Sequence, residues 1–163
     1  MNKLYLYVFF ISVTFISIIL QTTVLSPLKM GVFYIDYSLI AVIYISLFPE
    51  ISGLILLAFF SGYTIDVLSA ADVGVYTISR VSLYIFLRLL ITKVYSDKFI
   101  VEFGIILLSV VYERLLLYLV TGLENMSDPI LGLGFVIENV LVNAVAGYLF
   151  FYVLKEINER IKT

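Results

Sequence analysis

Long runs of apolar residues, separated by short polar breaks, fill almost the whole of this chain. Several breaks contain proline, as at Pro27, Pro49 and Pro129. Most runs have the length of a membrane-crossing helix, which needs about 20 mostly apolar residues. The pattern therefore predicts an all-α protein whose residues 1–163 form a single transmembrane domain, a bundle of six helices. The expected spans are residues 4–25, 33–48, 51–68, 75–91, 100–121 and 130–154.

Composition supports a chain that lies in lipid. Hydrophobic residues make up 63% of it, against about 45–50% in soluble domains, and its mean hydropathy is +1.13. A soluble fold of this size could not bury so much apolar surface. The sequence has no cysteine and no histidine, which excludes thiol nucleophiles, imidazole bases, disulfides and zinc sites built on those ligands. Because nucleotide-binding and hydrolase motifs are also absent, we expect no enzyme activity, catalytic residue, cofactor, metal or nucleic-acid partner.

Basic residues are distributed unevenly between the two sides of the predicted bundle. If the N-terminus is cytoplasmic, Lys29 is the only basic residue in the outer loops. Lys and Arg accumulate on the cytoplasmic side of membrane proteins, so we expect both termini of this multi-pass chain to be cytoplasmic. The basic residues on that side are Lys3, Arg88, Lys93, Lys98, Lys155, Arg160 and Lys162.

The segment after residue 154 has the pattern of a helical extension. Leu154, Ile157 and Ile161 share one helix face, and Glu156 stands four residues before Arg160, a spacing that allows an ion pair. We interpret this segment as a solvated helix end that anchors the last span. A docking site for a cytoplasmic partner is the alternative.

Charged residues inside the expected spans are the least ordinary feature of the sequence, because each costs about 2.5–3.5 kcal/mol at a helix centre. Counting about 1.5 Å per residue from the outer ends places most of them about 8–12 Å below the outer surface, with Asp66 shallower. We therefore expect a shared polar layer in which Arg80 pairs with Glu138 or Glu113. The residues assigned to this layer and its contacts are Asp66, Arg80, Glu113, Arg114, Glu138, Asn139 and Asn143.

Three roles for the polar layer remain open. It can be a structural latch between the last three helices, a docking site completed by a partner's transmembrane helix, or a substrate or proton path. Amide side chains favour helix–helix contact in lipid. Asn139 and Asn143 provide them on the last span at a spacing of four residues, and Gln21 does so on the first.

The stretch from Gly53 to Leu90 resembles the MreD family of bacterial rod-shape proteins. The family shows a Gly-x-x-x-Asp at the end of its third span, followed by a short turn with a glycine. Two departures are present: Val73 precedes the turn glycine, and Ile35 stands where the family has proline. The residues that carry the resemblance are Gly53, the run Phe59–Asp66 with Gly62 and Asp66, then Leu68, Gly74 and Tyr84, together with Gln21 at the end of the first span.

This resemblance implies a scaffold of the cell-elongation machinery in the bacterial inner membrane. Such a protein binds the bitopic protein MreC, acts beside the MreB cytoskeleton and the peptidoglycan synthases, and supports lateral peptidoglycan synthesis. The family also looks like the six-helix substrate-binding components of energy-coupling-factor vitamin transporters. A small-molecule-binding transport component is therefore the alternative function, and self-association is left open.

The basic asymmetry predicts which loops face outward. Because the chain has no native cysteine, single cysteines report cleanly on topology. Ala71→Cys should react with a membrane-impermeant thiol reagent added to intact cells, and Asp97→Cys should react only after the cells are permeabilised. Labelling of Asp97→Cys from outside would reverse the predicted orientation.

Overall fold

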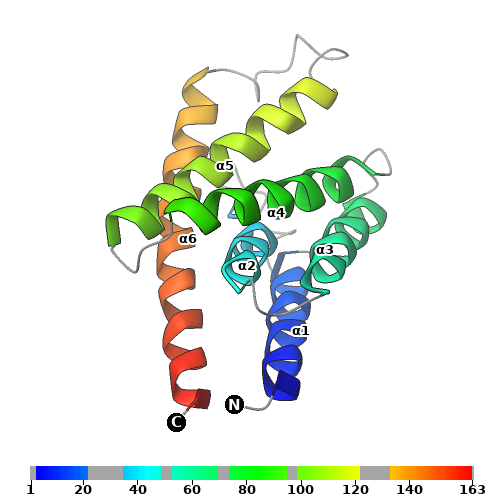
Figure 1. Cartoon of the computed structure of the whole chain (residues 1–163). Coiled ribbons are helices and arrows are strands. Elements are labelled where there is room, and N and C mark those ends of the chain that lie inside the picture. The colour runs from blue at the N-terminus through cyan, green and yellow to red at the C-terminus, as the bar shows by residue number, and fades with distance from the viewer. Residues whose placement is uncertain are drawn as a thin grey trace.

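The computed structural model of the 163-residue chain describes residues 3–21, 35–48, 53–69, 74–94, 99–121 and 133–162, and in the last range it describes side chains from Val140 to Arg160. All regular structure in these ranges is helical, which confirms the predicted all-α class (Figure 1). The helices are α1 Lys3–Ile19, α2 Tyr37–Ser46, α3 Leu54–Ser69, α4 Val75–Val94, α5 Phe99–Thr121 and α6 Leu133–Lys162.

The short helix α2 occupies the centre of the molecule (Figure 1), where it packs against every other helix. All its residues from Ser38 to Ser46 are buried. Its 10 residues rise about 15 Å, half the roughly 30 Å of a bilayer's hydrocarbon core. The expected second span, residues 33–48, is therefore wrong in length: over the described residues 35–48 only Tyr37–Ser46 is helical, and residues 33 and 34 lie outside the description.

Length and hydropathy support membrane crossing for one helical segment of the described chain. That segment is Val140–Arg160 within α6. Three other apolar stretches, Leu4–Ile19, Tyr37–Ser46 and Leu54–Leu68, are shorter. The multi-pass arrangement thus stays a prediction.

The last helix includes the segment predicted to extend it. α6 continues to Lys162, and the predicted pair is present, with Arg160 NH2 3.0 Å from Glu156 Oε1. One turn earlier, Lys155 Nζ lies 2.7 Å from Glu102 Oε1 in the first turn of α5. This second ion pair ties the start of α5 to α6, about two helical turns before α6 ends.

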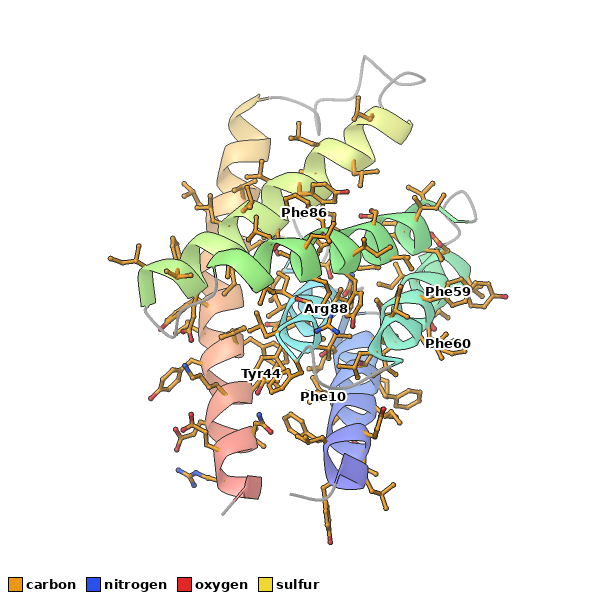
Figure 2. All side chains as sticks on the ribbon, viewed as in Figure 1. Phe10, Tyr44, Phe59, Phe60, Phe86 and Arg88 are labelled. Atoms are coloured by element: carbon orange, nitrogen blue, oxygen red, sulfur yellow. The ribbon has the colours of Figure 1, made fainter. Side chains whose placement is uncertain are left out.

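An aromatic cluster surrounds the C-terminal half of α2. Tyr44 contacts the rings of Phe10 in α1, Phe48 just after α2 and Phe151 in α6. Its hydroxyl donates a hydrogen bond to the carbonyl of Leu154 (3.2 Å). Figure 2 shows Phe10 and Tyr44 directed into the molecule. These contacts fix the end of α2 between the first and last helices.

The outer faces of the surrounding helices carry large apolar side chains. Phe59 and Phe60 of α3 point away from the molecule in Figure 2, and exposed leucines and isoleucines continue this surface over the other outer helices. The most exposed of them are Leu4 at 70%, Leu89 at 68% and Ile100 at 80%. The described residues thus place apolar groups outside and, as shown below, buried charges inside.

Glycines shape the α3–α4 hairpin. Gly53 and Gly74, with φ of +84° and +106°, precede α3 and α4 in a left-handed conformation that glycine adopts without strain. Gly62 has a different role, because a Cβ atom on it would lie 2.5 Å from the Cα of Thr77. The two helices therefore touch backbone to backbone at this point.

Enlarging Gly62 should separate the hairpin. Gly62→Ala is expected to lower the free energy of unfolding by about 1–3 kcal/mol, the usual cost of overpacking, because the obstructing atoms belong to the backbone. Gly104→Ala in α5 is the matched control, since a Cβ there meets nothing within 4 Å. Thermal unfolding of the purified variants measures both effects, and equal stability of the two variants would contradict the close contact.

Candidate functional site: a buried charge network at the start of α2

The first turn of α2 begins inside the protein. Asp36 is the N-cap residue, and its Oδ1 accepts hydrogen bonds from the Leu39 amide (2.8 Å) and the Ser38 hydroxyl (3.0 Å). An aspartate at this position satisfies amide groups that have no partner within the helix. The local sequence Asp-Tyr-Ser-Leu therefore starts a helix, but it also buries a carboxylate that needs a counter-charge.

Arg80 of α4 supplies that counter-charge and joins two carboxylates. Its NH2 lies 2.5 Å from Asp36 Oδ2, and its NH1 lies 2.6 Å from Glu113 Oε1 in α5. NH2 also donates to the Ser38 hydroxyl at 3.1 Å. The side chains of Arg80, Asp36 and Glu113 are 0%, 4% and 2% exposed. The predicted Arg80–Glu113 pair is therefore confirmed, and Asp36 is a second partner.

Two amide side chains complete the contacts around the start of α2. Asn143 Oδ1 of α6 accepts a hydrogen bond from the Asp36 amide (2.8 Å), and Gln21 Oε1 accepts one from the Ser38 amide (3.1 Å). Gln21 lies in a π-helical turn that follows α1. The turn after α1 and the helices α4, α5 and α6 thus all contribute. We call this set the α2-start network; its members are Gln21, Asp36, Ser38, Arg80, Glu113 and Asn143.

The network holds two carboxylates against one guanidinium. Arg114 follows Glu113 in α5, and among the described residues its buried Nε has no hydrogen-bond partner. A buried charge that loses its partner destabilises a protein by about 3–5 kcal/mol. Asp36 and Arg80 direct their charges at each other, so the network joins α2 to α4, and Arg80 joins α4 to α5 through Glu113.

Asp66 does not belong to the network, contrary to the prediction that placed it in the polar layer. Its Oδ1 accepts from the Tyr76 amide and its Oδ2 from the Thr77 amide, both at 2.9 Å, and Oδ2 also accepts from the Thr77 hydroxyl (2.5 Å). These bonds satisfy the first amides of α4. Asp66 is therefore a capping residue that α3 provides for its neighbour, one helical turn after Gly62.

The remaining predictions have different outcomes. Asn143 and Gln21 form long-range contacts, as expected of amides between helices. The side chains of Glu138 and Asn139 lie outside the described residues, so the alternative pair Arg80–Glu138 stays a prediction. The predicted polar layer did not include Asp36, although this residue is a central member of the network. An acid placed directly before an apolar run is an N-cap signal, and that signal was available.

Comparisons with protein-family models, curated proteins and solved structures gave no match to this chain.

Removing the charge of Arg80 tests the network directly. Arg80→Gln should leave Asp36 and Glu113 buried without a counter-charge and lower the free energy of unfolding by about 3–5 kcal/mol. Arg88→Gln is the control on the same helix, since Arg88 is only partly buried and lies over the Tyr84 ring, 5.6 Å from its centroid. Unfolding of each purified variant in mixed micelles measures its free energy of unfolding.

A charge-free network should recover part of this loss. Adding Asp36→Asn and Glu113→Gln to Arg80→Gln removes every unpaired charge and keeps hydrogen-bonding groups in place. A triple variant no more stable than Arg80→Gln alone would show that the three charges do not act together.

Proposed function

We propose that this chain is an MreD-like scaffold of the bacterial inner membrane, which takes part in cell elongation by binding a bitopic MreC-like protein. The observation that carries the proposal is the unit formed by Gly62, Asp66 and the start of α4. Gly62 allows the backbones of α3 and α4 to touch, and Asp66 caps α4 at the same place. The two residues of the Gly-x-x-x-Asp spacing, on which the resemblance rests, thus act together in this chain: both hold the start of α4 against α3.

The distribution of polar and apolar groups supports a membrane location. Charged side chains form a closed network at the centre, whereas large apolar side chains cover the outer faces of the helices. Soluble proteins do not gain by exposing so many large apolar groups, and lipid solvates them. Figure 1 also places the N- and C-terminal ends at the same end of the molecule, which supports a multi-pass chain with both termini in the cytoplasm.

A scaffold role is supported by how the charged groups are used. Ligand recognition requires polar groups that converge on a cavity. Here Asp36 and Arg80 are engaged with each other and with α2, so they favour a latch between helices over a solute site. This supports a scaffold over the transport alternative. A scaffold without chemistry of its own acts by binding one conformation of its partner more tightly than others, through its apolar outer faces.

The partner separates this proposal from the transport alternative. Tagged protein purified from its membrane in mild detergent should retain an MreC-like bitopic protein. MreB and peptidoglycan synthases are expected in the same assembly. The protein should unfold at higher temperature with that partner, because a ligand of the folded state stabilises it. Copurification of ATPase subunits, or of one small molecule per chain, would favour the transport component instead.

Cell shape is the readout of the same proposal in vivo. Depletion in a rod-shaped host should produce round, wide cells, since lateral wall synthesis loses its scaffold. The Arg80→Gln chain should fail to restore the rod shape and Arg88→Gln should restore it. Cells that keep their shape after complete depletion would exclude a role in elongation.

A further inference from the structure

Helix α2 is too short and too polar at its start to be stable in lipid by itself. It has 10 residues, against about 20 for an independent transmembrane helix, and Asp36 stands at its first turn. A free carboxylate at depth costs several kilocalories per mole, and so does each unpaired backbone amide. The stability of α2 in its observed position must therefore come from the other helices.

The groups that hold α2 are distant in sequence. The Asp36 amide bonds to Asn143, 107 residues later, and the Asp36 carboxylate pairs with Arg80, 44 residues later. At the other end, the Tyr44 hydroxyl reaches the Leu154 carbonyl, 110 residues later. These partners exist only when α4 and α6 have been placed in the bundle.

The surrounding helices pack against one another without α2. α1 contacts α3, α3 contacts α4, α4 contacts α5, and α5 contacts α6. We call these five helices, α1 and α3 to α6, the shell, because each contacts the next. Their interfaces include the backbone contact at Gly62 and the Lys155–Glu102 ion pair. A shell of this kind can persist while its central element is absent.

We propose that α2 is a separately docked element: the shell assembles first, and α2 then enters it as Arg80 pairs with Asp36. Arg80 is the positioning residue for this step. Undocked, Asp36 lies at the water interface, where a carboxylate is solvated; docked, it is paired. α2 therefore has two states, and the shell remains folded in both. The proposal rests on the membrane location proposed above but requires no partner.

Gly147 of α6 faces both α2 and α5, so a cysteine at this one position can probe both interfaces. A Cβ at this position would lie 3.3 Å from an atom of Ile40 in α2 and 3.2 Å from an atom of Ile106 in α5. The double variant Gly147→Cys/Ile40→Cys thus reports on the docking of α2. The double variant Gly147→Cys/Ile106→Cys reports on the shell. Disulfide formation needs Cβ atoms about 3.5–4.5 Å apart, and the native chain has no cysteine to interfere.

Oxidative cross-linking of each pair in native membranes, with and without Arg80→Gln, tests the proposal. We expect both pairs to form in the parent. With Arg80→Gln, the α2 pair should form at least about tenfold more slowly, since each 1.4 kcal/mol lost by the docked state is tenfold in its population. The shell pair should still form at the parent rate, because it joins α5 to α6, whereas the Arg80–Glu113 contact that the variant also removes joins α4 to α5. Arg88→Gln is the control and should change neither pair.

Every other pattern overturns the proposal. Loss of both pairs with Arg80→Gln would show that the bundle is one cooperative unit without a separate α2 step. Retention of both would show that Arg80 does not position α2, and loss of the shell pair alone would place the effect of Arg80 elsewhere. No partner protein enters this cross-linking assay. A failure of the α2 docking proposal is therefore distinguishable from a failure of the scaffold proposal, which the copurification experiment tests.

Discussion

The two ion pairs of Arg80 are the interaction on which the arrangement of the bundle depends. One guanidinium joins the N-cap carboxylate of α2 to Glu113 of α5, with all three side chains almost fully buried. Burying three charges is costly unless each is paired, so the two ion pairs favour the register of α2, α4 and α5 that brings these side chains together. Gln21 and Asn143 extend that requirement to α1 and α6.

This constraint explains the unusual place of α2. Its amides and its N-cap carboxylate need polar partners, and in the membrane location proposed above only other helices can supply them. The helix is therefore held at the centre, while the helices around it direct large apolar side chains outward. In the proposed membrane location, lipid as the solvent requires both the buried polar contacts and the exposed apolar side chains.

Sequence reasoning predicted six helices, the number found in the described residues, together with the tail of α6 and the Arg80–Glu113 pair, because long apolar runs and deep charges are local features. It failed at α2 and Asp66. The expected span 33–48 treated Asp36 as an ordinary position of a full-length helix and left it out of the polar layer. The structure begins α2 at that residue, inside the bundle. Asp66 looked like one more buried charge, since the α4 amides that it accepts from become its neighbours only through the close contact at Gly62.

The chemistry of position 80 also explains why this residue is arginine and not lysine. NH2 donates hydrogen bonds to Asp36 and the Ser38 hydroxyl, while NH1 forms an ion pair with Glu113. These acceptors lie on two different helices, and they are matched by the separate nitrogens of one rigid, planar group. A lysine ammonium is a single point of charge on a flexible stem. It would have to favour one carboxylate and leave the other buried and unpaired, so positive charge alone does not satisfy the site. Its geometry requires a forked cation that links α2 to α5 through α4.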